Sequence, residues 1–329
     1  MHNSCRLPLL FCLLLLFLAS CARPPAPTDI GSPLAFTSDD HDSLAGRFLP
    51  VFLIDNPRET YNLPGSPRAT VAPNGEEIIS IDPTHASIYS KEQQFSTEKG
   101  TYTNLIYRIH FPETPLSFFP FNIGAGSNVG LLIIVTLNSH GQPLLYTTLH
   151  TCGCYLAFVP TTYLDEAAYP KYRQKNRRQQ VYSQSLPSIL DFSAKDLSKS
   201  QTVVHITSAT HRIRDIWLAD QASLAAFNSR NIQLRPLDSL KTLPTAAGGT
   251  RSFYETSGGR KGYVKGSQKI GERLLIGWWA LDWRVGEDKE FASERQDGPV
   301  FYTSLKPWAR DASDLRNFAA FLSYWGWKF

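Results

Sequence analysis

Apolar and polar residues alternate along several short segments of the chain, which is the pattern of β-strands with one buried face. Residues 102–111 show it most clearly, because apolar side chains hold one parity and polar side chains the other. The apolar set is Leu105, Tyr107, Ile109 and Phe111, and the polar set is Asn104, Arg108 and His110. The segment predicts a strand with one face in the core and one face in solvent.

Residues 130–137 are apolar on both parities, which predicts a central strand covered on both faces. The turn-forming residues 138–143 and a second apolar strand at 144–151 follow, so the two strands are expected to form a hairpin. Further strands are predicted at residues 48–54, 77–81, 202–207 and 273–281.

Helical patterns are fewer. Residues 215–227 have apolar side chains partly on one helical face. The chain ends in a stronger pattern, in which Ser313 is the expected N-cap, Gly326 ends the helix, and the apolar positions are Leu315, Phe318, Phe321, Leu322 and Trp325. The predicted fold class is α+β, with a mainly antiparallel β-sheet and a few helices that include a C-terminal amphipathic helix. Residues 44–329 are expected to form one domain, and the weakly patterned residues 170–201 are the alternative point of division.

The composition fits a folded protein with a sizeable core. Hydrophobic residues make up 42% of the 329, aromatic residues 12% and charged residues 19%, which excludes a disordered, collagen-like or coiled-coil chain. The formal net charge of +4 is mild and singles out no class of partner.

The N-terminus has the three parts of a secretory signal: Arg6 in a short first part, an apolar run at 7–18, and small residues before Cys21. The sequence Leu-Ala-Ser-Cys at 18–21 resembles the lipobox of bacterial lipoproteins. This resemblance implies that residues 1–20 are removed and that Cys21 carries the lipid. Ala22 stands where many inner-membrane lipoproteins have Asp, so the expected location is the outer membrane, facing the periplasm. The alternative is an ordinary signal peptide with an incidental cysteine.

Residues 21–43 are predicted to be a tether. Pro24, Pro25, Pro27 and Pro33 favour extended chain, and few apolar residues are available for burial. Removal of residues 22–43 is therefore expected to leave folding intact. The acidic residues 39–42 that close the tether are interpreted as a solvated linker end, with a cation site as the alternative.

Of the five cysteines, only Cys152 and Cys154 remain as thiols once the signal is removed and Cys21 is lipidated. They follow His150 at spacings of two, so in an extended chain all three side chains would share one face. Imidazole and two thiolates suit Cu(I) or Zn, and His110 on another strand is a further candidate ligand. A structural disulfide, inert thiols and a redox pair stay open as alternatives.

Six of the seven tryptophans lie after residue 277, and several carboxylates accompany them. Aromatic surfaces with polar rims bind ligands, so this region is a candidate binding site. Its candidate residues are Trp278, Trp279, Asp282, Trp283 and Asp288. The alternative interpretation is that the indoles belong to the core.

Residues 171–178 contain five basic side chains and no acidic one, which suits an anionic envelope surface or a solvated loop. Nucleic acid is not an expected partner in this compartment. The sequence contains no Gly-x-Ser-x-Gly, His-Glu-x-x-His or phosphate-binding loop.

These features predict a membrane-tethered extracytoplasmic lipoprotein that acts as a non-enzymatic binding or envelope-associated module. The alternative is a periplasmic enzyme. It would be either a thiol redox catalyst using Cys152 and Cys154, or a hydrolase using the Trp-rich acidic residues 278–290.

Overall fold

The computed structural model describes residues 31–117, 122–171, 178–193, 200–246, 248–292 and 298–329. The chain consists of a short N-terminal part, Met1–Gly31, and a compact unit, Ser32–Phe329. All the described helices and strands lie in the compact unit. Among the described residues, none of the helices has the length and apolar character needed to span a bilayer.

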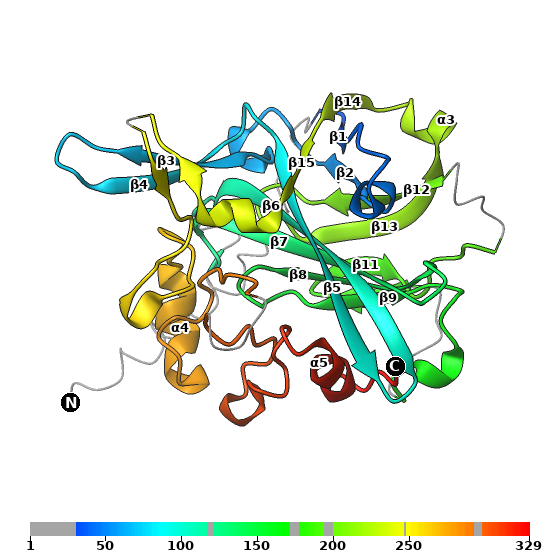
Figure 1. Ribbon diagram of the computed structural model, residues 1–329. Coiled ribbons are helices and arrows are strands. Elements are labelled where there is room, and N and C mark those ends of the chain that lie inside the picture. Colours follow the sequence, from blue (N-terminus) through cyan, green and yellow to red (C-terminus); the bar gives the residue numbers. More distant parts are fainter. Residues whose placement is uncertain (1–30, 118–121, 172–177, 194–199, 247, 293–297) are drawn as a thin grey trace, which may run out of the picture. The chain divides into compact units, whose positions relative to one another are not determined.

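The first sheet has five strands in the order β13-β12-β2-β1-β14 (Figure 1). In that order the strands are β13 (Ile213–Asp220), β12 (Ser200–Ile206), β2 (Val51–Ile54), β1 (Leu34–Thr37) and β14 (Asn228–Asn231). The β12–β2 and β1–β14 pairs are parallel, and the other two pairs are antiparallel.

The second sheet has six strands in the order β15-β5-β6-β7-β8-β9. They are β15 (Gln233–Pro236), β5 (Ser87–Thr97), β6 (Gly100–Thr114), β7 (Gly126–Leu137), β8 (Pro143–His150) and β9 (Ala157–Pro160). Only β15 joins its neighbour in parallel; β5 to β9 form an antiparallel meander.

Three hairpins and several short helices complete the fold. The hairpins pair β3 (Ser66–Val71) with β4 (Glu77–Asp82), β10 (Arg178–Val181) with β11 (Gln184–Pro187), and β16 (Leu243–Pro244) with β17 (Thr250–Arg251). The α-helices are α2 (Leu44–Arg47), α3 (Gln221–Leu224), α4 (Ile270–Ala280) and α5 (Phe318–Tyr324). The 3-10 helices are η1 (Thr60–Asn62), η2 (Glu166–Ala168), η3 (Leu237–Lys241), η4 (Gly258–Arg260) and η5 (Pro307–Ala309).

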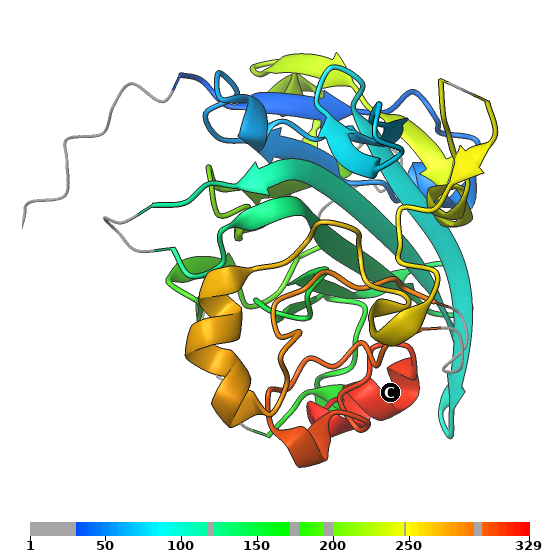
Figure 2. The same ribbon diagram turned by 90° about the vertical axis from the view of Figure 1, so that its left-hand side faces the viewer.

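The six-stranded sheet lies in the middle of the compact unit, with the five-stranded sheet on one side and the C-terminal segments with α4 and α5 on the other (Figures 1 and 2). One core joins the two sheets, and a second core joins the six-stranded sheet to the C-terminal segments. Strand β7 belongs to both, because Leu131 and Ile133 lie in the first core while Leu132 and Ile134 lie in the second. The predicted central strand, its hairpin with β8, and the α+β class with mainly antiparallel sheets are therefore confirmed.

Strand β6 was predicted to have a solvated polar face, and this is wrong. Asn104, Arg108 and His110 are all buried, because the segments after residue 236 cover that face. Two nitrogens of the Arg108 guanidinium have partners inside the protein: Nη1 donates to the carbonyl oxygen of Lys289 at 2.6 Å, and Nε donates to Nε2 of His110 at 3.0 Å.

Three other predicted elements differ in the structure. Residues 215–227 are not one helix, since strand β13 runs to Asp220 and only the one-turn helix α3 follows. Residues 273–281 are not a buried strand, since residues 273–280 belong to helix α4 and Leu281 is its C-cap. At the C-terminus, the helix α5 begins only after Asn317, whose side chain caps it, and Ser313 lies outside it.

The predicted boundary of the tether is also wrong. Leu34 to Thr37 form β1, an interior strand of the five-stranded sheet, and Leu34 and Phe36 are part of the core between the sheets. The folded unit therefore begins near residue 32 and not at 44, and removal of residues 22–43 would delete a strand. The short apolar run of β1 was missed because it is flanked by proline and acidic residues.

Candidate functional site

The two thiols lie in a tight turn that follows β8. The strand ends at His150, whose amide N–H donates to the carbonyl oxygen of Cys154 at 2.9 Å, while the N–H of Gly153 donates to the His150 carbonyl at 2.8 Å. Gly153 has φ +94°, and a side chain on it would overlap the carbonyl oxygen of Tyr302. Only glycine fits this position, so the turn depends on it.

The turn places the side chains of Cys152 and Cys154 near enough that their interaction with each other is the first cause of the pKa shift of each thiol. Both are free thiols; Cys152 is buried and Cys154 is partly exposed. The sequence predicted that they share a face because they lie on one strand. That reason is wrong, since the strand has ended, and it is the turn that places the sulfurs together.

Both sulfurs lie on the wall of a pocket of about 170 Å³. The rest of the wall is largely aromatic and aliphatic, and its members are Ile123, Tyr155, Tyr182, Ile276, Val285, Tyr302 and Leu305, together with Thr303 and the glycines 153 and 286. Glu272 from α4 also lines the pocket. It is buried, and its Oε2 has no hydrogen-bond partner among the residues that the structure describes.

Buried charges lie behind the thiols. Lys269 and Asp288 form an ion pair at 3.4 Å, in which both side chains are at least 97% buried. Asp288 also accepts a hydrogen bond from the hydroxyl of Thr151. The side chain of Lys289 donates to the carbonyl oxygen of Cys152 at 2.7 Å, and its amide donates to the carbonyl oxygen of Thr151 at 2.9 Å. The thiol turn is therefore held by residues from a segment more than a hundred positions later.

These neighbours make the two thiols unequal. The hydrogen bond from the Cys154 thiol lowers the pKa of Cys152, burial opposes this, and the positive charge of Lys269 acts in the lowering direction. The same hydrogen bond raises the pKa of Cys154 well above its ordinary value, and burial adds to that shift. The pair therefore loses its first proton from Cys152, and Cys154 holds the second.

Lys269 and Glu272 also have shifted pKa values. Burial alone would lower the pKa of Lys269, but the carboxylate of Asp288 and the thiols keep that pKa well above its ordinary value. Burial raises the pKa of Glu272, and the charge of Lys269 opposes this. A carboxyl group with a raised pKa and a thiol with a lowered pKa therefore line one pocket, and the buried cation of Lys269 lies near enough to influence both.

The candidate histidines do not join the thiols. Nε2 of His150 donates to the carbonyl oxygen of His211 at 3.1 Å, and its ring stands edge-on to Tyr155. His110 is bonded to Arg108 on the polar parity of β6. Within the described residues, no three side chains of His, Cys, Asp or Glu are placed to hold a metal ion. The predicted Cu or Zn site therefore has no support from this geometry.

The Trp-rich region does not form one cleft. Asp288 is fully buried behind the thiols, whereas Asp282 accepts a hydrogen bond from the hydroxyl of Tyr302 at 2.6 Å beside a different pocket of about 420 Å³. The rings of Trp278, Trp279 and Trp283 are exposed on and just after α4, so they belong neither to the core nor to that pocket. A hydrolase that uses Asp282 and Asp288 together is not supported.

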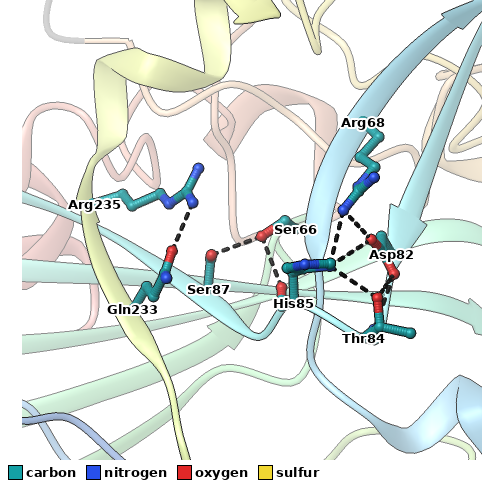
Figure 3. Close-up of polar contacts among 8 residues, drawn as sticks. All are labelled: Ser66, Arg68, Asp82, Thr84, His85, Ser87, Gln233 and Arg235. Carbon is teal, nitrogen blue, oxygen red and sulfur yellow. Dashed lines mark hydrogen bonds and ion pairs between the residues drawn. The ribbon is translucent and has the colours of Figure 1, made fainter. Parts of the chain in front are cut away.

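A second polar cluster, which the sequence did not suggest, lies where β3, β4 and β5 meet (Figure 3). Nδ1 of His85 lies 2.9 Å from Oδ2 of Asp82, and Arg68 lies 2.5 Å from the same oxygen. Burial by itself would raise the pKa of Asp82, but hydrogen bonds from Thr84 and His85 and the charge of Arg68 lower it to about 2.

This cluster contains Ser, His and Asp but lacks the geometry of a catalytic triad. The hydroxyl of Ser66 donates to the backbone carbonyl of His85 at 2.7 Å and lies 2.6 Å from the hydroxyl of Ser87, as Figure 3 shows. Both serines are buried, so neither hydroxyl is available as a nucleophile activated by the imidazole. The contacts of this cluster hold β3, β4 and β5 together. The thiol pocket is therefore the better candidate for a functional site.

Two predicted features fall largely outside the described residues. Cys21 and the signal belong to residues 1–30, and the basic stretch at 171–178 is described only at its ends. Arg178 at one end is the first residue of β10, and its guanidinium pairs with Asp215 at 2.8 Å.

No protein-family model, curated protein or solved structure matches this chain significantly. The function is therefore inferred from the residues of the thiol pocket. The sequence pattern identified the two thiols as candidate site residues. It did not identify Thr151, Lys269, Glu272 and Lys289, because nothing in their local pattern indicates that the fold brings these residues to the thiols.

Proposed function

We propose that this chain is a membrane-tethered extracytoplasmic thiol–disulfide exchange protein, in which Cys152 and Cys154 form a reversible disulfide that oxidises thiols entering the pocket. The observation that carries the proposal is that two free thiols line the same apolar pocket, near enough for each to shift the pKa of the other. The adjacent Lys269–Asp288 pair supports it, because a buried cation stabilises the thiolate that disulfide cleavage releases.

The different exposure and pKa of the two thiols determine which sulfur is attacked and which sulfur leaves. A thiolate of an incoming dithiol attacks Sγ of Cys154, the more exposed sulfur. The Cys152–Cys154 bond breaks, and its electron pair leaves on Sγ of Cys152, whose lowered pKa makes it the better leaving group. The second substrate thiol loses its proton to water and attacks the mixed disulfide, and Cys154 leaves and takes up a proton. The substrate becomes a disulfide, the pair becomes a dithiol, and a second disulfide-bearing molecule reoxidises it.

The first test is a redox titration of the native protein against mixtures of reduced and oxidised glutathione. We expect an intramolecular disulfide to form, with the loss of two hydrogens by mass spectrometry. We also expect the pair to be less oxidising in the Lys269→Met, Asp288→Asn variant, which removes the cation without leaving a charge unpaired. A tenfold change in the equilibrium corresponds to about 30 mV.

The single cysteine variants are the matched controls. With Cys152→Ser, the partly exposed Cys154 should form a stable mixed disulfide with glutathione, whereas with Cys154→Ser the buried Cys152 should react more slowly. Native protein that forms no internal disulfide at any glutathione ratio would show that the thiols are structural, and the binding-module interpretation would replace this one.

The membrane tether gives a separate prediction. The Cys21→Ser variant should incorporate no radiolabelled fatty acid, because the lipobox cysteine is the proposed attachment point. Label that persists in this variant would show that the lipid is attached elsewhere or that the resemblance at residues 18–21 is incidental.

A further inference from the structure

Helix α4 exposes apolar side chains to an unusual extent. Of the thirteen large apolar residues that are exposed within the described part of the chain, seven lie in residues 270–283. They are Ile270, Leu274, Leu275, Trp278, Trp279, Leu281 and Trp283. A monomeric protein rarely leaves so many neighbouring apolar side chains in water, and such a surface is typical of a site that binds a partner.

The polarity of the helix is the reverse of an ordinary surface helix. Ile270, Leu274 and Trp278 follow one another at spacings of four and form a continuous outer stripe, with Leu274 and Trp278 each 66% exposed. The charged Glu272 is turned inward to the thiol pocket, and the helix buries otherwise only Gly277 and Ala280. A surface helix normally places its apolar residues inward and its charges outward.

We infer that the outer face of α4, with Leu281 and Trp283, docks on a lipid bilayer and lays the thiol pocket at the membrane surface; this inference rests on the proposed tether at Cys21. The helix has eleven residues, which is too short to cross a bilayer, so it lies in the interface plane. Indole rings favour that interface, because one edge is polar and the rest is apolar.

Charge and chain length both favour lipid as the occupant. Arg273 is the exposed charged residue of α4, and a guanidinium beside apolar side chains suits anionic headgroups. Cys21 is joined to Ser32 by so few residues that their fully extended length is at most about 40 Å. An anchored domain would thus stay next to the bilayer, with the outer face of α4 within reach of lipid.

The substrate class follows from this placement. Glu272 and Ile276 of α4 line the thiol pocket, while their neighbours on the same helix form the docking face. Thiols carried by membrane-attached or membrane-emerging chains would therefore reach Cys154 before thiols free in solution.

The test uses the exported full chain carrying Cys21→Ser, so that no lipid contributes, mixed with vesicles of phosphatidylethanolamine and phosphatidylglycerol. The protein should co-sediment with the vesicles. The further change Leu274→Gln, Trp278→Gln should lower its partition coefficient about tenfold or more, because two large apolar side chains no longer enter the interface. The matched control is Val71→Gln, Ile78→Gln, which alters two exposed apolar residues of the β3–β4 hairpin and should leave binding unchanged.

Each remaining outcome decides the matter. Equal binding by the parent and the α4 variant, or no binding by either, would overturn the docking surface. The lipid anchor at Cys21 is tested separately, by the incorporation of radiolabelled fatty acid. Self-association in analytical ultracentrifugation that the α4 variant abolishes, without vesicle binding, would assign the face to a second copy and overturn the inference. Circular dichroism melting of every variant should match the parent, since all four changed residues are exposed.

Discussion

Lowering the pH from about 7.5 to about 4.5 should reduce the free energy of unfolding by about 3 kcal/mol through His211 alone. His211 is buried, stacks on Phe111, and bonds through Nε2 to the carbonyl oxygen of Tyr61 at 3.0 Å. Burial is the main cause that lowers its pKa from 6.5 to about 3, and the charge of Lys269 contributes to the lowering.

The sign of this change in stability follows from the number of protons that the folded and unfolded chains bind. Between about pH 6.5 and about pH 3 the unfolded chain protonates this imidazole and the folded chain does not, so stability falls as pH falls through that window. Burial also lowers the pKa values of His110 and His150 well below the ordinary range, so both histidines add to the loss in the same direction.

Urea unfolding at a series of pH values measures this effect. His211→Asn should make the dependence shallower by close to one proton, and asparagine tolerates the φ of +51° at this position. His140→Asn, in the exposed β7–β8 turn, is the control for the substitution itself and should unfold at the same urea concentration as the parent at about pH 7.5. An unchanged slope in the His211 variant would show that this imidazole is not buried in its neutral form.

Asp288→Asn should cost about 3–5 kcal/mol, because it leaves the buried ammonium of Lys269 without its carboxylate. The double variant Lys269→Met, Asp288→Asn should recover much of that loss, since both charges of the buried pair are removed together. The measurement is the free energy of unfolding in urea for the two single variants and the double variant, which together form a double-mutant cycle.

A surface pair provides the comparison. Asp238 and Lys241 lie 3.4 Å apart on η3 in exposed positions, and Asp238→Asn should change stability by no more than about 1 kcal/mol. Similar small effects at Asp288 and Asp238 would mean that water reaches the pair behind the thiols, and the proposed stabilisation of the Cys152 thiolate would lose its basis.

The sequence predicted the strands well wherever apolar residues were closely spaced. Strands β4, β6, β7 and β8 lie at or near their predicted positions, because their patterns are long enough to separate a period of two from a helical one. The turn at 138–143 was also informative, since Asn138 accepts two backbone hydrogen bonds that close it.

The errors have a common physical origin. The pattern shows that a side chain is apolar but not what covers it: residues 273–281 are as apolar as a buried strand, yet they form a helix whose outer face is in solvent. Conversely, Arg108 and His110 look like solvated residues but are covered by segments from far along the chain. The charges around the thiols could not be predicted for the same reason, since only the tertiary structure brings Lys269 and Asp288 to Cys152.

The place of β1 in its sheet also governs the order in which the chain can fold. Leu34 pairs with Ile54 nearby, but its other neighbour is Asn228, and β2 gains its second partner only from β12. As the chain grows from its N-terminus, β1 and β2 form a hairpin whose β2 edge stays open until β12 pairs with it and whose β1 edge stays open until β14, Asn228–Asn231, follows. Such edges invite pairing with other chains, so the interval between emergence and closure is the period in which this protein most needs a chaperone.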